Sequence, residues 1–176
     1  MKTILSVVVA AAVFVAPALA ASAEPIKTYT DPVFLYSIDY PDTWKLKHAG
    51  KYAVLASPFQ SKEDRFAENV SIVAEDLSQA PTEITLIDYY RQSVGDAPRR
   101  LQDFKILEEA QTVWNGHNSV ANLYTMTSKG EPFKCKTYTF MEGKMAYVLI
   151  YTGRAADFDA YLAEAERIMR SIQVSP

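Results

Sequence analysis

Alternation of apolar and polar positions along the first half of the chain predicts β-strands joined by turns. Phe34, Tyr36, Ile38 and Tyr40 are separated by single residues, and a period of two places them on one face of a strand. Further strands are expected over residues 44–48, 52–56 and 69–77. The intervening range 57–68 is polar and charged, so a surface loop is expected there.

The second half of the chain shows the clearest pattern, in which glycine turns separate four strand-like segments. The segments are residues 104–114, 117–128, 131–141 and 144–151, and the turns are Asn115-Gly116, Lys129-Gly130 and Glu142-Gly143. Asn-Gly is typical of a hairpin turn that needs positive φ at both central residues. The pattern predicts an antiparallel meander. Its last segment is apolar on both faces, so helices are expected to cover both.

Two stretches with apolar residues three and four positions apart predict helices. The first begins at Thr85, with Asp88 completing a variant of the capping box, and ends at Gly95 and Pro98. Asp157 can cap the second, whose apolar stripe comprises Phe158, Tyr161, Leu162, Ala165, Ile168, Met169 and Ile172. Together the elements predict an α+β fold, a central antiparallel sheet of about six to eight strands with helices on both faces, or α/β/α sandwich.

The first 23 residues have the layout of a cleaved secretory signal peptide. Lys2 precedes an uncharged apolar run from Ile4 to Val15, Pro17 breaks the run, and small residues allow cleavage after Ala20 or Ala23. The alternative is an uncleaved membrane anchor, because a spanning helix needs about 20 apolar residues. We expect residues 1–23 to be a signal peptide and residues 24–176 one domain, soluble in a bacterial periplasm or secreted.

The charge balance narrows the class of partner. Removal of residues 1–23 takes away Lys2 alone among charged residues, so the formal net charge changes from −3 to −4. An acidic chain offers no electrostatic basis for binding nucleic acid or anionic lipid. No later stretch of the sequence is long and apolar enough to span a bilayer, so no integral membrane span is expected after cleavage.

The single cysteine, Cys135, rules out an intramolecular disulfide. A free cysteine in a strand is most often a buried apolar residue, and the alternative is an intermolecular disulfide or a reactive thiol. Because side chains alternate along a strand, Lys134 and Lys136 are expected to point away from Cys135. We therefore expect an inert thiol.

The remaining residue types do not assemble a recognisable catalytic motif. His48 and His117 stand at predicted strand ends without a second residue at metal-site spacing, and they are expected to be solvated turn residues. The chain has no G-x-S-x-G elbow, and Glu63-Asp64 offer at most a weak Ca²⁺ or Mn²⁺ site. No catalytic, cofactor-binding or metal-binding residues are predicted.

The polar loop at residues 57–68 is the sequence's best candidate for partner contact. Phe59 and Phe66 are bulky apolar residues in a charged segment that also carries Lys62 and Arg65. Exposed aromatic residues of this kind mark interaction surfaces. The alternative is that the two phenylalanines fold back and anchor the loop.

The segment Tyr36-Ser37-Ile38-Asp39-Tyr40-Pro41-Asp42-Thr43-Trp44 resembles the start of PsbP-like and DcrB-like domains. The order of expected elements over residues 30–174 is also similar to these domains. The resemblance implies a central antiparallel sheet with helices on both faces and a binding or accessory role. It carries over no set of functional residues, and fold by itself does not give function.

Two hypotheses of function follow. The first is an exported, non-enzymatic binding or accessory protein of the bacterial cell envelope, with an envelope protein of unknown identity as partner. The second is a periplasmic small-ligand-binding protein or hydrolase whose site is assembled from distant residues. A deep pocket with converging polar groups, including His48 or His117, would favour the second.

Overall fold

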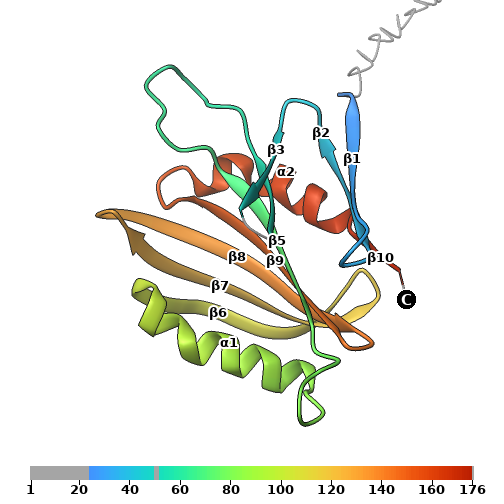
Figure 1. Ribbon diagram of the computed structural model, residues 1–176. Coiled ribbons are helices and arrows are strands. Elements are labelled where there is room, and N and C mark those ends of the chain that lie inside the picture. The colour runs from blue at the N-terminus through green and yellow to red at the C-terminus, as the bar shows by residue number, and fades with distance from the viewer. Residues whose placement is uncertain (1–23, 50–51, 176) are drawn as a thin grey trace, which may run out of the picture.

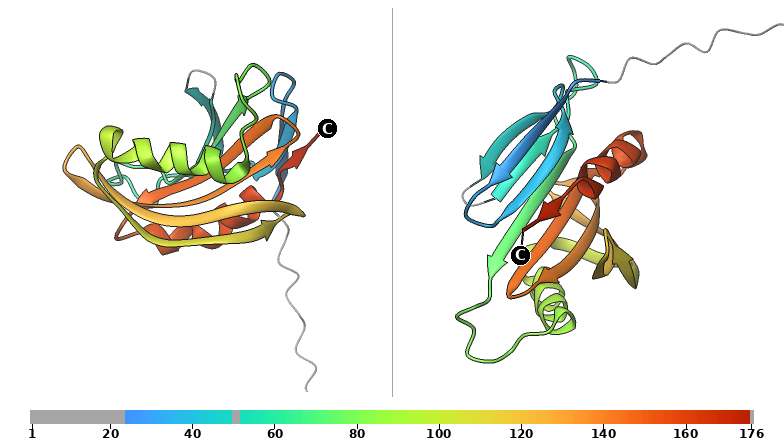
Figure 2. Two further views of the ribbon diagram at one scale, coloured as in Figure 1. Left: turned by 90° about the horizontal axis from the view of Figure 1, so that it is seen from below. Right: turned by 90° about the vertical axis from the view of Figure 1, so that its right-hand side faces the viewer.

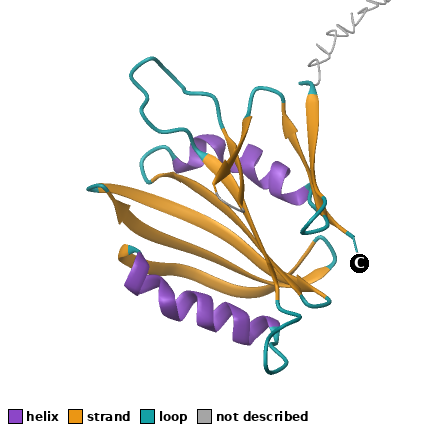
Figure 3. Ribbon diagram, viewed as in Figure 1, coloured by secondary structure: helices purple, strands orange, loops and turns teal. Residues whose placement is uncertain are grey.

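The computed structural model describes residues 24–49 and 52–175, so the predicted signal peptide lies outside the described residues. Strands dominate this part of the chain, and two helices accompany them (Figure 1, Figure 3). In chain order the elements are β1 (Ile26–Asp31), β2 (Tyr36–Pro41), β3 (Lys45–Ala49), β4 (Tyr52–Ala56), β5 (Asn69–Asp76), α1 (Leu86–Arg100), β6 (Gln102–Trp114), β7 (His117–Ser128), β8 (Glu131–Glu142), β9 (Met145–Arg154), α2 (Phe158–Arg170) and β10 (Gln173–Val174).

The strands form two antiparallel sheets. The larger has seven strands in the order β3-β4-β5-β9-β8-β7-β6, and the smaller has three in the order β1-β2-β10. The predicted meander is confirmed, since β6, β7, β8 and β9 pair consecutively. Asn115 and Gly116 both have positive φ, 49° and 84°, as the tight turn between β6 and β7 requires.

The two helices lie on opposite faces of the larger sheet, with α1 above it and α2 below it in the left view of Figure 2. The predicted α+β fold with helices on both faces is therefore confirmed. The apolar stripe of α2 is buried at Phe158, Ala165, Ile168 and Met169, and it joins a core cluster that includes Tyr147, Leu149 and Tyr151 of β9. Asp157 stands at the N-cap of α2 but makes no side-chain capping bond there.

Two element boundaries differ from the prediction. Residues 26–31, for which no strand was predicted, form β1, because β2 supplies a partner for every residue from Ile26 to Asp31. Helix α1 continues through Pro98 to Arg100. Pro98 stands in the last turn, where it removes one donor, while the Leu101 N–H still donates to the Ala97 carbonyl over 2.8 Å.

The turn between β1 and β2 also differs, because Phe34 and Leu35 lie in it rather than in a strand. Leu35 has a φ of 54°, a left-handed conformation that costs a non-glycine residue about 1–2 kcal/mol. Hydrogen bonds on both sides hold it: the Tyr147 hydroxyl donates to the Phe34 carbonyl over 2.8 Å, and the Ser175 N–H donates to the Leu35 carbonyl over 2.8 Å.

Candidate functional site

A cavity of about 790 Å³ opens between α1 and the larger sheet. Helix α1 packs mainly on β6, β7 and β8, and the neighbouring strands β5 and β9 contribute Val73, Val148 and Ile150 to the cavity wall. These three side chains are half-buried. The apolar pattern of β9 predicted that a helix would cover each of its faces. On the face toward α1 this cover is incomplete, and β9 lines a cavity there.

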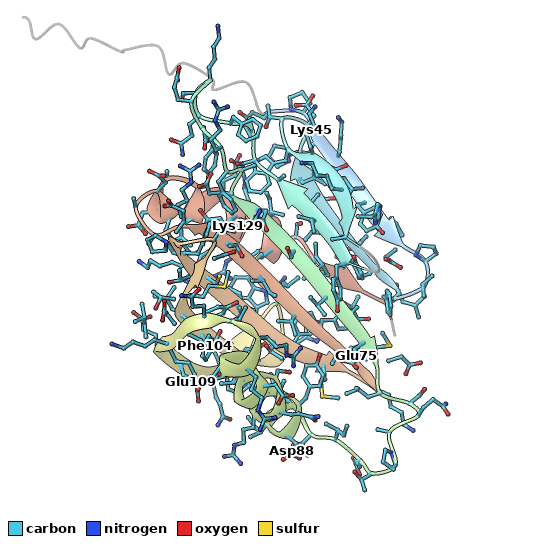
Figure 4. All side chains as sticks on the ribbon, turned by 60° about the vertical axis from the view of Figure 1, so that its left-hand side comes forward. Lys45, Glu75, Asp88, Phe104, Glu109 and Lys129 are labelled. Carbon is cyan, nitrogen blue, oxygen red and sulfur yellow. The ribbon has the colours of Figure 1, made fainter. Side chains whose placement is uncertain are left out.

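The first turn of α1 is capped by side-chain and backbone hydrogen bonds. The Thr85 hydroxyl accepts from the Asp88 N–H over 3.2 Å, and the Thr85 N–H donates to the Asp88 carboxylate over 3.4 Å, so the predicted capping box is confirmed. In the strands that α1 covers, Phe104 of β6 contacts the ring of Tyr124 of β7 with centroids 5.1 Å apart, and both rings line the cavity. In Figure 4, Phe104 and Glu109 of β6 lie beside α1.

Three buried polar side chains from three different elements form a polar cluster in the cavity wall: Tyr90 of α1, Asn122 of β7 and Thr137 of β8. The Asn122 amide donates to the Tyr90 hydroxyl over 3.1 Å, and the Thr137 hydroxyl donates to the Asn122 side-chain carbonyl. The Tyr90 hydroxyl donates in turn to Glu109 over 2.8 Å. Thr139, also buried, lines the wall beside them.

The electrostatics of the cluster keep its phenol neutral. Burial, together with the hydrogen bond to Glu109, raises the pKa of Tyr90 to about 12. Tyr89 on the same helix donates to Glu75 over 3.1 Å, and burial and that carboxylate raise its pKa as well. Both tyrosines therefore act as hydrogen-bond donors at neutral pH.

The charged residues of the cavity stand at its rim and are mainly acidic. They are Glu75, Asp76, Asp96 and Arg100, of which Arg100 lies 3.4 Å from Asp96. The Ser78 backbone N–H holds the pKa of Asp76 below its usual range, so that carboxylate is ionised at neutral pH. The arrangement can bind an uncharged molecule by apolar contact and hydrogen bonds, and it disfavours an anion.

The sequence singled out none of these residues. Asn122 and Thr137 are polar positions in predicted strands, and the register of β7 and β8 makes them direct partners. The sequence did contain one signal for this cluster, which is a polar residue inside each of two neighbouring apolar strands. Buried polar side chains need hydrogen-bond partners, so two such residues are expected to bond to each other. Tyr90 stands four residues from both Leu86 and Val94, a spacing typical of an apolar helix stripe. Only the packing of α1 shows that its hydroxyl completes a polar cluster.

The predicted partner-contact residues do not line the cavity, and the structure separates them into two groups. Phe59 is 61% exposed, and Lys62 and Arg65 are exposed near it in sequence. Phe66 instead packs on Phe133, with ring centroids 4.8 Å apart, and it is half-buried. Phe66 is thus an anchor of the loop, and Phe59 remains available on the surface.

The loop's backbone is held by Asp64. Its carboxylate accepts from the Phe66 N–H over 3.0 Å and from the Gln60 N–H over 3.1 Å, and it lies 2.9 Å from the Arg154 guanidinium. These bonds lower the pKa of Asp64. The loop between β4 and β5 is therefore tied to β9.

Glu68, at the base of this loop, is a buried carboxyl group that the sequence did not single out. It is 2% exposed, and its Oε2 atom has no hydrogen-bond partner among the residues that the structure describes. Burial raises the pKa of Glu68, and the nearby carboxylates of Asp64 and Asp157 act in the same direction. Only burial, which sequence pattern does not give for a single Glu, distinguishes it from the other acids of the loop.

The two histidines lie apart from the cavity. His48 is exposed and contacts the ring of Tyr29 at 5.6 Å. His117 is half-buried rather than solvated, because it lies 3.2 Å from Glu142 and stacks on Phe140 at 4.8 Å. Neither lines the cavity, so the converging polar groups come from Tyr90, Asn122 and Thr137 instead.

Cys135 is fully buried, as predicted. Its thiol lies 3.5 Å from the Thr152 hydroxyl, and burial raises its pKa. The neighbouring lysines lie on the opposite face of the sheet. Lys136 pairs with Glu166, and the Nζ atom of Lys134 lies 4.8 Å from the centroid of the Phe158 ring. The alternation of side chains therefore keeps both ammonium groups away from the thiol.

Within residues 24–49 and 52–175, no three His, Cys, Asp or Glu side chains come together in a way that could hold a metal ion. In the same part of the chain, no helix has the length and hydrophobicity needed to cross a membrane.

Comparison with known proteins shows the fold. No protein-family model and no curated protein matches the chain. The solved structures that resemble it include the protein of unknown function PA94 from Pseudomonas aeruginosa, with 16% identity and a TM-score of 0.61 over 86% of this chain and 98% of that one. Cyanobacterial PsbP from Synechocystis sp. PCC 6803 has 12% identity and a TM-score of 0.62 over 89% and 96%.

A third similar structure is LpqN of Mycobacterium tuberculosis, described as involved in cell envelope biogenesis. It has 13% identity and a TM-score of 0.56 over 86% of this chain and 92% of that one. The chain therefore has the fold of PsbP-like and DcrB-like domains, as its segment 36–44 predicted. At such low identities the likeness concerns the fold and carries no activity across.

Proposed function

We propose that this protein is an exported, non-enzymatic binding protein of the bacterial cell envelope, and that the cavity beside α1 holds a small, uncharged and largely apolar ligand. Export is supported by the signal-peptide layout of residues 1–23. A role in the envelope is supported by the fold shared with LpqN, itself described as an envelope biogenesis protein.

The observation that carries the ligand proposal is a cavity of about 790 Å³ with apolar walls and a buried polar cluster. Ligand sites are typically about 300–1,000 Å³, mostly apolar, with a few placed polar groups. Here Val73, Val148 and Ile150 supply apolar wall. Asn122 and Thr137 supply hydrogen-bonding capacity that a hydroxyl or carbonyl of the ligand can use.

The charge of the ligand follows from the rim. Three carboxylates and one guanidinium stand there, and the guanidinium of Arg100 is paired with Asp96. Bringing an anion past these carboxylates is unfavourable. An uncharged ligand meets no such penalty.

A pair of dyes tests this proposal. N-phenylnaphthylamine is uncharged, and anilinonaphthalene sulfonate is a similar molecule with an anionic group. Titration of the mature protein should show saturable fluorescence enhancement with the uncharged dye and much weaker binding of the sulfonate. Val148→Trp, which fills the cavity wall, should weaken binding of the uncharged dye by at least about tenfold, equivalent to about 1.4 kcal/mol.

Val54→Trp is the matched control. Val54 is also half-buried in a strand of the larger sheet, but it does not line the cavity. This variant should bind the dye as the wild type does. Absence of saturable binding to the wild type, or equal affinity in the two tryptophan variants, contradicts the proposal.

A second candidate function, contact with an envelope protein, is favoured by Phe59. An aromatic side chain that is 61% exposed, on a loop held in place by Asp64 and Arg154, is suited to act as an anchor in an interface. Lys62 and Arg65 add positive charge beside it. The contact would not require the cavity.

Photocrosslinking in the native envelope tests this second function. A crosslinker at position 59 should give a discrete adduct, while one at position 26 should not, although Ile26 is also exposed, at 56%. In a pull-down without the crosslinker, Phe59→Ala should abolish capture of the envelope protein, and its thermal stability should equal that of the wild type. Phe66→Ala should lower stability by about 1–2 kcal/mol, below the range of about 3–5 for a fully buried phenylalanine. No adduct, or the same adduct from both positions, would count against the loop.

A further inference from the structure

Strand β6 is the last strand of the larger sheet, and its outer edge has no strand partner in the described part of the chain. Every side chain from Leu107 to Val113 is exposed, with Leu107 at 45% and Val113 at 65%. An exposed edge presents a row of unpaired N–H and C=O groups, which is a template for another strand.

The turn at Asn115-Gly116 determines which backbone groups face outward. Trp114 and His117 are the pair that closes this two-residue hairpin, and such a closing pair exchanges hydrogen bonds. Hydrogen-bonded and non-hydrogen-bonded pairs then alternate along the ladder. The N–H and C=O groups of Val113, Gln111 and Glu109 therefore point away from β7.

The features that usually protect an edge are confined to the first half of β6. The register with β7 shifts between Gln102 and Lys105 and again between Ile106 and Glu108, and such bulges bend an edge away from new partners. From Glu108 to Trp114 the pairing is regular. That part contains no Pro, Lys or Arg.

A hollow of about 560 Å³ lies next to the unprotected part of the edge. Leu86 and Ile87 from the first turn of α1 line one side, and Gln111 and Val113 line the other. An edge strand with a helix alongside it can hold an extended peptide, in which main-chain hydrogen bonds give affinity and a pocket for alternate side chains gives specificity.

The charges around this edge are mainly acidic. Glu108 and Glu109 are exposed on β6 and Asp88 is exposed on α1. The nearby bases are Arg91 on α1 and Arg170 of α2, which lies 4.0 Å from the centroid of the Trp114 ring. Glu109 and Asp88 are labelled in Figure 4, on the two elements that border the hollow. Pairing two copies of this chain along β6 would bring like charges together, whereas a basic segment would be attracted.

We propose that the edge of β6 from Glu108 to Trp114 is a strand-addition site for an extended, basic segment of a partner protein. One aliphatic side chain of that segment enters the hollow between Val113 and Leu86. A Lys or Arg of the segment lies near Glu108 and Glu109. The hollow shares no lining residue with the cavity, although Glu109 also accepts from the Tyr90 hydroxyl of the polar cluster. The site is separate from the loop at residues 57–68.

A library of random dodecapeptides, displayed and selected on the mature protein, tests the proposal. Selected peptides should alternate β-branched or aliphatic residues with other residues, and they should carry Lys or Arg. Gln111→Pro removes one outward N–H and leaves the ladder to β7 intact, so it should weaken peptide binding by at least about tenfold. Gln111→Thr keeps the N–H and should bind as the wild type does.

Hydrogen exchange on the wild type gives a second measurement that needs no variant. The amide protons of Glu109, Gln111 and Val113 should gain protection when a selected peptide binds. The proposal is overturned if no peptides are enriched, if they bind Gln111→Pro as well as Gln111→Thr, or if those three amides stay unprotected. A dimer in sedimentation that Gln111→Pro dissociates would also overturn it, because a second copy would then occupy the edge.

Discussion

Replacement of Glu68 by Gln should stabilise the protein at neutral pH. Glu68 is almost fully buried, and its Oε2 atom has no hydrogen-bond partner within residues 24–49 and 52–175. Burial raises the pKa of its carboxyl group. In the folded state the neutral form is favoured, whereas the unfolded chain ionises near the ordinary glutamate pKa of about 4.3. The contribution of Glu68 to folding stability is therefore fully present below about pH 4.3, and it is lost as the pH rises through the raised pKa of the folded state.

The magnitude follows from the raised pKa of Glu68. At a pH above both pKa values, each unit of difference between the folded and unfolded states destabilises the fold by about 1.4 kcal/mol, and Gln avoids this penalty because it does not ionise. Backbone N–H groups of Glu68 and Arg154 favour the charged form and offset part of this cost. A net gain of about 1 kcal/mol for Glu68→Gln corresponds to a rise in Tm of about 2–4 °C for a chain of this size.

Thermal unfolding of the wild type and of Glu68→Gln at a series of pH values measures the effect. The difference in Tm should be near zero at acid pH and should grow toward pH 8. Glu63→Gln is the control, because Glu63 is an exposed acid of the same loop and should show no such trend. If Glu68→Gln is less stable than the wild type at pH 8, the carboxylate is paired in solution and the reasoning is wrong.

Two further predictions concern single residues. Leu35→Gly should raise the free energy of unfolding by about 0.5–1 kcal/mol in denaturant titrations, because relief of a left-handed φ outweighs the added chain entropy; a loss of stability would mean that the exposed side chain contributes more than the backbone strain. Cys135 should react with a thiol reagent only after unfolding, since the thiol is fully buried and its pKa is raised; rapid labelling of the native protein would contradict its burial.

Much of the fold could be predicted, because its signals are local. Alternating apolar and polar residues predict the strands of the meander from β6 to β9. Glycine turns such as Asn115-Gly116, where the backbone has positive φ, predict how these strands are connected. The capping box at Thr85 and the apolar stripe of α2 are equally local. Strand β1 was missed because its own pattern is weak and its pairing with β2 supplies the stability.

The candidate sites could not be predicted in the same way. Tyr90, Asn122 and Thr137 are far apart in the sequence, and each alone has an ordinary explanation on its own element. They become a polar cluster only because α1 packs over β7 and β8 and the register of these strands pairs Asn122 with Thr137. Glu68 likewise differs from its neighbouring acids only in burial.

The sequence by itself determined most of the strands, the glycine turns, the presence of the two helices and the resemblance to PsbP-like and DcrB-like domains. It did so because residue period, turn chemistry and capping act over a few residues. Only the tertiary structure decided that α1 leaves part of the sheet open as a cavity, that Phe66 anchors its loop while Phe59 is exposed, and that β6 is an edge. These depend on contacts between distant segments, which local pattern does not encode.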